Sequence, residues 1–528
     1  MKFRRYHLII IFFFLFSAAI AGRLFDIQVK NYQKWRAFAQ GQQSRYENNF
    51  AERGKIFFSN SSFPVALNRD SAYVFLTPAE IKEQDSAVQF LSVVLGLSES
   101  EIMEKLGQRD NLFAVLKENL NETEIEKIKE GNLKGVYLGK ERKRYYPQAG
   151  LGSRLLGFVD ADGKGQYGLE GYYDNVLGSE EDLILTIDYN VQFMAEKLLQ
   201  QAKENLDIEA GQIIVLDPNT GKIIALADFP NFDPNNYSEY AKKGELDIFQ
   251  NSATQKVFEP GSVFKPITMA IGLEKEVIAP QTTYIDQGFV KFGGSTVYNY
   301  DGRKYGQRTM TEVLEKSINT GAVFVEGLIS HDVFLDYLGK FGFFEKSGID
   351  LNEVYSENRE LKKGYEINFA TASFGQGIEM TPIQLVRAFS SLINGGKMIK
   401  PYIVDRENTP ESPDFIISPK TSSQIAVMLV SAVENGFGKA ARIPGYYIGG
   451  KTGTAQVPYS ALGINKSGYS DKTVQSFVGF GPAFNPQFII LVKLNNPKAK
   501  TAEYSAIPIF RELAGYIINL WQIAPDYE

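Results

Sequence analysis

The sequence predicts an α+β protein whose C-terminal part is built on a five-stranded antiparallel sheet covered by helices. Two apolar runs in residues 211–229 flank Pro218–Asn219–Thr220–Gly221, which is turn chemistry, and so predict a β-hairpin. Three further apolar runs follow at 446–457, 474–483 and 487–496, and the short connections between them favour an antiparallel arrangement. The simplest assembly places the two early and three late strands in one sheet, with the helical residues between them packed on it.

Composition excludes several classes of function. The chain has 528 residues, enough for two or three domains, and 44% are hydrophobic, as in a folded protein. The absence of cysteine excludes thiolate catalysis, disulfides and iron–sulfur clusters, and two histidines, His7 and His331, argue against a histidine-rich metal centre. The net charge of -6 gives no general attraction to nucleic acid. We therefore expect no metal, no cofactor and no nucleic-acid partner.

The N-terminus combines positive charge with an apolar run. Basic residues within 2–5 precede the uncharged stretch 8–22, which is at the short end of the length that spans a membrane. Arg23 can snorkel to the interface and lengthen the span, so an uncleaved membrane anchor is the favoured interpretation. A cleaved signal peptide is the alternative, because Ala19–Ile20–Ala21 has the small-x-small form of a cleavage site. Positive charges on both sides of the run leave its orientation open.

Residues 25–185 have a mixed α/β pattern in which nothing looks catalytic. Residues 71–76 form a strand-like run and 120–135 a polar helical stretch. The glycine-rich segment 157–178 predicts a flexible loop that tightens around aromatic residues, which we interpret as a structural joint. A β-rich run then ends at Asp188, a plausible N-cap, and an apolar helical pattern continues to about residue 205.

The first candidate for chemistry is the stretch FEPGSVFKP, residues 258–266. Ser262 and Lys265 are three residues apart, so on a helix their side chains lie on one face. The turn Pro260–Gly261 can open that helix, which places Ser262 at its positive end, where backbone N–H groups favour an alkoxide or an oxyanion. Burial of Lys265 would lower its pKa enough for it to act as a base. The pattern S-x-x-K also arises by chance, so it needs support from other motifs.

The second candidate is Ser317–Ile318–Asn319. Thr309 and Glu312 form a capping-box pattern that starts a helix, and the candidate follows two turns later. The hydroxyl of Ser317 can relay a proton, and the amide of Asn319 can orient Lys265 together with a substrate amide. Taken alone, a serine or asparagine near a helix end is usually a cap.

The third candidate is GGKTGTAQV, residues 449–457. Glycine in a strand, as at Gly453, marks a bulge or a close backbone approach, and a strand edge freed of side chains can pair with an extended peptide. Lys451 and the hydroxyls of Thr452 and Thr454 offer charge and hydrogen bonds to a carboxylate. The alternative is an ordinary sheet strand with a surface lysine.

With S-x-x-K, S-x-N and K-T-G in this order, the sequence resembles the penicillin-binding proteins and, in detail, the class B proteins with a single membrane span. The middle motif of the family is usually S-D-N, so Ile318 departs from it. Further segments typical of the family cover nearly the whole chain: RLFDIQV, ERGKIFFSN, YGLEGYYD, LDPNTGKIIALADFPNFDPN and SFGQGIEMTPIQLVRA. Among them, ERGKIFFSN departs from the usual form R-G-x-I-x-D. The resemblance favours the uncleaved anchor over the signal peptide.

The resemblance also implies three parts of the chain. Residues 1–24 would be a cytoplasmic tail and transmembrane anchor, and residues 25–185 an elongated, non-catalytic pedestal, often called the dimerisation domain. Residues 186–528 would be the transpeptidase domain.

The activity that the resemblance implies is that of a peptidoglycan D,D-transpeptidase. Ser262 would attack the carbonyl between the two terminal D-alanines of a stem peptide, Lys265 would take its proton, and the backbone N–H groups of Ser262 and Thr454 would hold the oxyanion. An amine of a neighbouring stem would then attack the acyl-enzyme and form the cross-link. Penicillins and other β-lactams would acylate the same serine. The base is disputed in such enzymes, so Lys265 in that role is a hypothesis.

The other motif residues would bind and position the substrate. Ser317 would pass a proton to the departing D-alanine, and Asn319 would position Lys265 and the peptide. The substrate carboxylate would be bound by Lys451, Thr452, Gly453 and Thr454.

Residues 311–328 and 373–385 are most like the division-specific, FtsI-type subfamily, which implies a role in septal wall synthesis. Such a protein would lie in the inner (cytoplasmic) membrane with its catalytic domain outside the cytoplasm. Its partners would be a membrane-embedded glycan polymerase of the shape, elongation and division family and other divisome proteins. Two alternatives stay open: a D,D-carboxypeptidase or β-lactamase-like hydrolase, in which water replaces the amine, and a division scaffold with a vestigial site.

Overall fold

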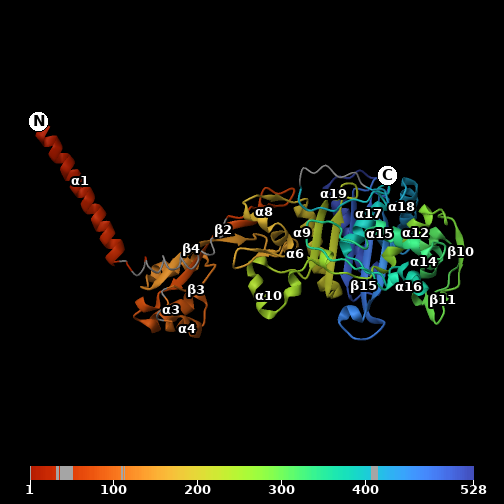
Figure 1. The fold of residues 1–528 in the computed structure, drawn as a ribbon, viewed down its shortest axis with the longest axis horizontal. Helices are drawn as coiled ribbons and strands as arrows, with labels where there is room; N and C mark the ends of the chain where they lie inside the picture. The colour runs from red at the N-terminus through yellow and green to blue at the C-terminus, as the bar shows by residue number, and fades with distance from the viewer. Residues whose placement is uncertain are drawn as a thin grey trace. The chain divides into compact units, whose positions relative to one another are not determined.

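The computed structural model describes residues 2–30, 32, 35, 52–108, 111, 113–405 and 414–528 (Figure 1). The chain divides into two compact units. The first unit comprises Met1–Arg53 and Leu67–Tyr145, and the second comprises Gly54–Ala66 and Tyr146–Glu528. The expected domain limit between residues 185 and 186 does not coincide with this division, because residues 146–185 pack within the second unit.

The N-terminal helix α1 (Lys2–Phe25) continues as a π-helical turn, Asp26–Lys30. Its apolar stretch Ile9–Val29 has 21 residues, none of them buried within the described structure. At about 1.5 Å per residue this stretch is about 31 Å long, close to the ~30 Å hydrocarbon core of a bilayer. The side chains of Arg23 and Asp26 form an ion pair of 3.0 Å, so their two charges offset each other. The helix fits a single-pass membrane anchor.

In the first unit, β2 pairs antiparallel with both β3 and β4, and helices pack on this sheet through residues such as Leu91 and Ile102. Helices α4 and α5 each begin with a capping box, formed by Ser98 with Glu101 and by Asn121 with Glu124. The strand expected at 71–76 and the helix expected within 120–135 are confirmed. The elements are β2 (Pro64–Leu76), α3 (Gln84–Leu95), α4 (Glu99–Gly107), β3 (Ala114–Lys117), α5 (Glu122–Gly131) and β4 (Val136–Tyr145).

The glycine-rich segment 157–178 is not the joint that its composition predicts. It folds within the second unit as a short hairpin followed by two short helices. The ring of Phe158 stacks on Tyr237 with centroids 4.3 Å apart and lies 4.8 Å from Phe249, so aromatic burial outweighs the flexibility of the glycines. The elements of this region are β1 (Ile56–Phe57), α6 (Ser153–Leu156), β5 (Phe158–Val159), β6 (Gly165–Gln166), α7 (Gly168–Tyr172), α8 (Asp174–Gly178) and β7 (Leu183–Ile184).

The centre of the second unit is the expected five-stranded antiparallel sheet, in the order β14-β15-β16-β8-β9. The early hairpin and the three late strands are confirmed, and they join where β16 pairs with β8. The strands are β8 (Ala210–Leu216), β9 (Ile223–Phe229), β14 (Gly449–Pro458), β15 (Tyr469–Gly481) and β16 (Phe488–Asn495).

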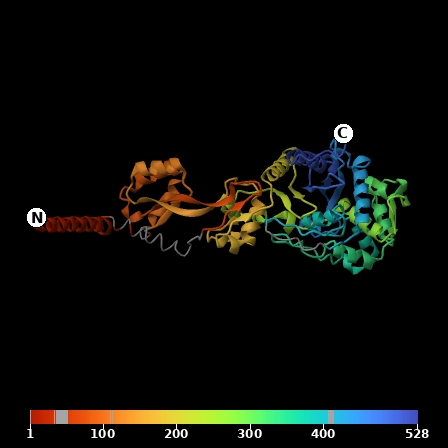
Figure 2. The ribbon, with the colours of Figure 1, turned by 90° about the horizontal axis from the view of Figure 1, so that it is seen from above.

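Helices cover both faces of this sheet (Figures 1 and 2). On one face, α9 (Tyr189–Leu206) and α19 (Ala506–Leu520) pack against the strands, with Phe510 against Phe477 at a centroid distance of 4.8 Å. The side chain of Asp188 accepts hydrogen bonds from the backbone N–H groups of the first turn of α9, so the expected N-cap is confirmed. The other face packs against the residues inserted between β9 and β14.

The insertion is largely helical, as expected, but it also contains a short hairpin at 289–298 and an antiparallel strand pair, 283–286 with 306–309, that the helical periodicity did not indicate. Its helices are α10 (Tyr237–Lys243), α11 (Ser252–Gln255), α12 (Lys265–Glu274), α13 (Met310–Glu315), α14 (Asn319–Glu326), α15 (His331–Lys340), α16 (Glu366–Ala372), α17 (Pro382–Ser391) and α18 (Pro419–Glu434). Its strands are β10 (Thr283–Asp286), β11 (Phe289–Phe292), β12 (Ser295–Tyr298) and β13 (Gly306–Thr309).

Candidate active site

Ser262 lies in a 3₁₀ turn, Gly261–Phe264, that leads directly into α12. The turn depends on glycine, because Gly261 has a φ of 60° and its N–H donates to the carbonyl of Gly375 over 2.9 Å. Gly375 has a φ of 83°, and a Cβ there would lie 2.2 Å from the carbonyl oxygen of Gly261. Ser262 therefore occupies the first turn of the helical segment, as the sequence predicts.

Lys265 is fully buried, with 0% of its surface exposed, and its Nζ lies 3.0 Å from Oγ of Ser262. The spacing of the S-x-x-K motif thus brings the two side chains together. Burial and the nearby charge of Lys451 hold the pKa of Lys265 well below the ordinary value of a lysine. A neutral amine in this position can accept the proton of the serine hydroxyl.

Ser317 lies between α13 and α14 with a φ of 53°, an unusual conformation for a serine. The capping box of Thr309 and Glu312 is confirmed, but its helix ends at Glu315, so Ser317 sits in a loop. The carbonyl oxygen of Ser317 lies 2.5 Å from Nζ of Lys265, and its Oγ lies 3.2 Å from the same nitrogen. A neutral Lys265 can donate its two N–H groups to Ser317 and accept from Ser262 with its lone pair.

Lys451 on β14 approaches the same hydroxyl from the sheet. It is 2% exposed, and its Nζ lies 2.9 Å from Oγ of Ser317 and 3.1 Å from the carbonyl oxygen of Thr452. Burial lowers the pKa of Lys451 to about 7. The alternative of a surface lysine is wrong, since this side chain is enclosed.

Gly453 allows β14 to lie close to the turn that carries Ser262. A Cβ at this position would lie 2.5 Å from Oγ of Ser476 and 3.0 Å from a methyl carbon of Val263. The close backbone approach that glycine predicts in this strand is therefore present. Thr452 and Thr454 are half-buried on the same strand.

Asn319 is placed differently from the expectation. Its amide Nδ2 donates to the carbonyl oxygen of Tyr298 over 3.0 Å. Among the residues that the structure describes, no hydrogen bond joins Asn319 to Lys265. The loop carbonyl of Ser317 holds the lysine amine instead, and Asn319 marks the first residue of α14.

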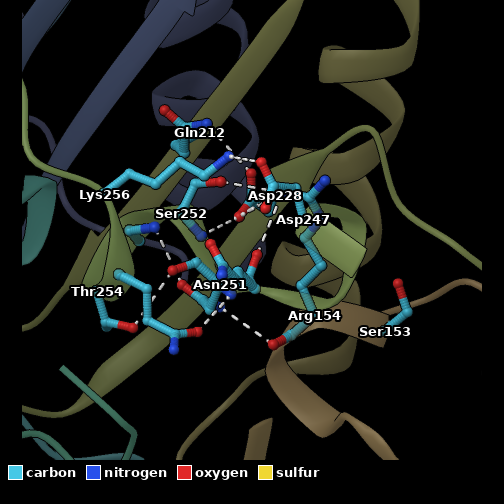
Figure 3. Close-up of polar contacts among 12 residues, drawn as sticks. Ser153, Arg154, Gln212, Asp228, Asp247, Asn251, Ser252, Thr254 and Lys256 are labelled. Atoms are coloured by element: carbon cyan, nitrogen blue, oxygen red, sulfur yellow. Dashed lines mark hydrogen bonds and ion pairs between the residues drawn. The ribbon is translucent and has the colours of Figure 1, made fainter. Parts of the chain in front are cut away.

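A buried polar network crosses the same face of the sheet, and the motifs did not indicate it. Figure 3 shows Asp228 with Arg154, Ser252 and Gln212 around it. Oδ2 of Asp228 accepts the backbone N–H of Ser252 over 2.6 Å and lies 3.4 Å from the guanidinium of Arg154. Oδ1 accepts from Gln212 over 3.1 Å, and Gln212 in turn accepts from Lys493 over 2.8 Å. Single polar residues within apolar strands are the signal that could have located this network.

The network supports the segment that leads to Ser262. Nζ of Lys493 lies 4.9 Å from the ring centroid of Phe258, four residues before the serine. Burial lowers the pKa of Lys493 to about 8. A cavity of about 1030 Å³ adjoins this region, with Lys493, Phe258 and Glu259 in its lining. Among the described residues, including those that line this cavity, no group of three or more His, Asp or Glu side chains could hold a metal ion.

Comparison with known proteins agrees with the motifs. Residues 211–515 match the model of the penicillin-binding protein transpeptidase domain, and residues 48–197 match that of the penicillin-binding protein dimerisation domain. Stage V sporulation protein D of Bacillus subtilis (strain 168) is 29% identical over 94% of this chain and 82% of its own length. A protein of Mesostigma viride named peptidoglycan D,D-transpeptidase FtsI homolog is also 29% identical, over 99% of this chain and 97% of its own.

The fold is shared with a solved structure as well. The crystal structure of a peptidoglycan synthetase from Bifidobacterium adolescentis ATCC 15703 superposes with a TM-score of 0.68 at 23% identity, covering 90% of this chain and 97% of the other. Both family models and the relatives that align over most of the chain indicate the same family. The chain belongs to the class B penicillin-binding proteins.

Proposed function

We propose that this protein is a peptidoglycan D,D-transpeptidase that cross-links stem peptides through a serine acyl-enzyme on Ser262 and is acylated by penicillins at the same atom. The observation that carries the proposal is a continuous chain of polar contacts. It runs from Ser262 to Lys265 over 3.0 Å, from Lys265 to Ser317 over 3.2 Å and from Ser317 to Lys451 over 2.9 Å. This chain joins a nucleophile, a base, a proton relay and a cation without histidine.

In the acylation step, Oγ of Ser262 attacks the carbonyl carbon between the two terminal D-alanines, and its proton passes to Nζ of Lys265. The lowered pKa of Lys265 supports this role, because a buried neutral amine is available as base. The backbone N–H groups of Ser262 and Thr454 hold the oxyanion of the tetrahedral intermediate. The C–N bond then breaks, and the amine of the terminal D-alanine leaves with a proton supplied through the hydroxyl of Ser317.

In the transfer step, an uncharged amine of a neighbouring stem attacks the ester carbon of the acyl-enzyme. A new amide bond forms, the ester bond to Ser262 breaks, and the proton of the amine returns to Oγ through Lys265. The net reaction exchanges one amide for another and needs no metal or cofactor.

The substrate carboxylate binds on β14. Lys451, Thr452 and Thr454 supply the charge and the hydroxyls, while Gly453 lets the strand approach the serine turn. A carboxylate beside Nζ of Lys451 favours the protonated form, so substrate binding raises the lowered pKa of that lysine. Asn319 contacts the peptide amide from the start of α14.

Labelling with a fluorescent penicillin tests this function. We expect the wild type to carry one covalent label that is lost in Ser262→Ala, with equal thermal stability of the two proteins. An unlabelled wild type, or equal labelling of the variant, would instead support a scaffold with a vestigial site. Products from a stem-peptide substrate with an acceptor amine separate transfer from hydrolysis, since release of D-alanine without a cross-linked dimer identifies a carboxypeptidase.

The helix α1 supports a single-pass place in a membrane, and the resemblance to the class B family implies that this is the inner (cytoplasmic) membrane with the catalytic domain outside the cytoplasm. The FtsI-type segments support a role in septal wall synthesis with a glycan polymerase of the shape, elongation and division family and other divisome proteins. A fluorescent fusion should gather at the division site and should be recovered with that polymerase. A uniform distribution around the cell would contradict the septal role.

A further inference from the structure

A buried carboxylate lies behind the loop that carries Ser317 and Asn319. Asp286, the last residue of β10, is 0% exposed, and its Oδ1 accepts the hydroxyl of Thr320 over 2.6 Å. Both of its oxygens lie 3.0 Å from Nδ2 of Asn299. Thr320 is the residue directly after Asn319, so this carboxylate holds the first turn of α14 from inside the protein.

The carboxylate is also bound by the backbone. Oδ1 accepts the N–H of Gly288 over 2.9 Å, and Oδ2 accepts the N–H of Tyr305 over 2.7 Å. Burial by itself would raise the pKa of Asp286, but the hydrogen bonds from Thr320, Gly288, Tyr305 and Asn299 outweigh it and keep the pKa below its usual value. The short contact to Thr320 has the length of a hydrogen bond to a charged oxygen.

The neighbours of this carboxylate reach the same turn by two further contacts. The backbone N–H of Thr320 donates to Oδ1 of Asn299 over 3.1 Å. The side chain of Asn319 donates to the carbonyl oxygen of Tyr298 over 3.0 Å. Both residues at the start of α14 are thus held by the adjacent pair Tyr298 and Asn299, and Asp286 fixes Asn299 in turn.

This arrangement has consequences for the catalytic groups. Ser317 contacts both Lys265 and Lys451, yet it sits in a loop with a φ of 53°, so its place depends on what anchors the loop on either side. On the C-terminal side, that anchor is Thr320. A shift of the loop would move the Ser317 carbonyl and hydroxyl away from Nζ of Lys265.

We propose that Asp286 is a positioning residue of the transpeptidase site, which acts through Thr320 and Asn299 to hold the loop of Ser317 against Lys265 and to fix Asn319 at the start of α14. The expected effect of Asp286 on the acylation rate rests on the proposed function. Its expected effect on the loop rests only on its hydrogen bonds. The hydroxyl of Thr320 should therefore matter for acylation although it touches no catalytic side chain.

The test compares two variants of Thr320 in the full-length protein, one without the hydroxyl and one that keeps it. Thr320→Val keeps the shape and removes the hydroxyl that donates to Asp286 and lies 3.1 Å from the hydroxyl of Tyr284, whereas Thr320→Ser keeps both contacts. Thr186→Val is the matched control, because Thr186 is also buried and donates over 2.6 Å to the carbonyl of Ile223, away from the site residues. The measurements are the rate of labelling by a fluorescent penicillin, resolved into binding and acylation, the melting temperature, and amide hydrogen exchange of residues 317–322.

We expect Thr320→Val to lower the acylation rate constant about tenfold, as the loss of a hydrogen bond to a buried charge allows, with little change in penicillin binding. Thr320→Ser should retain most of the rate, and Thr186→Val should lose stability but not rate. Asp286→Asn, which places an amide against backbone N–H groups, should lower the acylation rate further. If the wild type is labelled, equal acylation rates for Thr320→Val and Thr320→Ser would overturn the proposal.

Hydrogen exchange separates this inference from the proposed function. Faster exchange of residues 317–322 in Thr320→Val, but not in the other variants, supports the role of Asp286 in positioning the loop. This holds even if the wild type takes no label, a result that would contradict only the transpeptidase proposal. Unchanged exchange together with unchanged labelling overturns the role of Asp286 while leaving the function of Ser262 intact.

Discussion

Lys265 and Lys451 both contact the hydroxyl of Ser317, yet their surroundings favour different chemical roles for the two amines. Lys265 touches Ser262 and has its pKa lowered by burial and by the charge of Lys451, whereas Lys451 lies on β14, the strand proposed to bind the substrate carboxylate. An arginine stays protonated in a protein, so it can replace a cation but not a base. We expect Lys265→Arg to lower the rate of penicillin labelling by about 10²- to 10⁴-fold, and Lys451→Arg to lower it much less.

The pH dependence of labelling has a definite sign. A lowered pKa means that Lys265 loses its proton at a lower pH than an ordinary lysine, and only the neutral amine can accept from Ser262. The acylation rate constant of the penicillin-bound wild type should therefore fall as the pH falls through that lowered pKa, and reach a plateau above it. Stopped-flow labelling over a range of pH checks this. Equal losses in the two arginine variants, or a flat pH profile, would argue against Lys265 as the base.

At the scale of elements, the site depends on how closely β14 packs on the turn before α12. An added Cβ at Gly453 would lie 2.5 Å from Oγ of Ser476 and 3.1 Å from the carbonyl oxygen of Pro260, so Gly453→Ala must move the strand or the turn. We expect a loss of stability of about 1–3 kcal/mol and at least a tenfold slower labelling. Gly515→Ala is the control, because a Cβ there meets nothing within 4 Å on α19 and should stabilise the helix by about 0.5–1 kcal/mol. Unchanged labelling of Gly453→Ala would show that the close approach is not needed.

At the scale of the whole molecule, the question is whether the mature protein retains α1 or loses it by signal-peptide cleavage. Its 21-residue apolar stretch extends to Val29, beyond the Ala19–Ile20–Ala21 sequence that resembles a cleavage site. We expect the mature protein to keep its N-terminal residues and to need detergent for release from membranes, because about 31 Å of exposed apolar helix is stable only in a bilayer. Intact mass spectrometry measures this directly. A mature chain that begins at Gly22 and is released by salt alone would identify a signal peptide.

Local patterns were sufficient for much of the architecture. The turn at Pro218–Asn219–Thr220–Gly221, the N-cap at Asp188 and the apolar runs of the late strands depend on neighbouring residues, and the structure contains each of them. The three motifs are also local, so the candidate residues could be named before their distances were known. For residues 157–178 the predicted packing around aromatic residues is confirmed, with Phe158 on Tyr167, but the predicted flexible joint is not, because Tyr237 and Phe249, some eighty to ninety residues away, also pack on Phe158.

By itself, then, the sequence determined the five strands, the order of the motifs and the pairing of Ser262 with Lys265, since residues three positions apart on a helix lie on the same face. Only the tertiary structure decided that Ser317 bridges two lysines, from which it is 52 and 134 positions distant, and that Asn319 turns to Tyr298. It also revealed the five hydrogen bonds of Asp286. Such contacts arise when separate elements pack together and bury polar groups that must find partners, a condition that no local pattern contains.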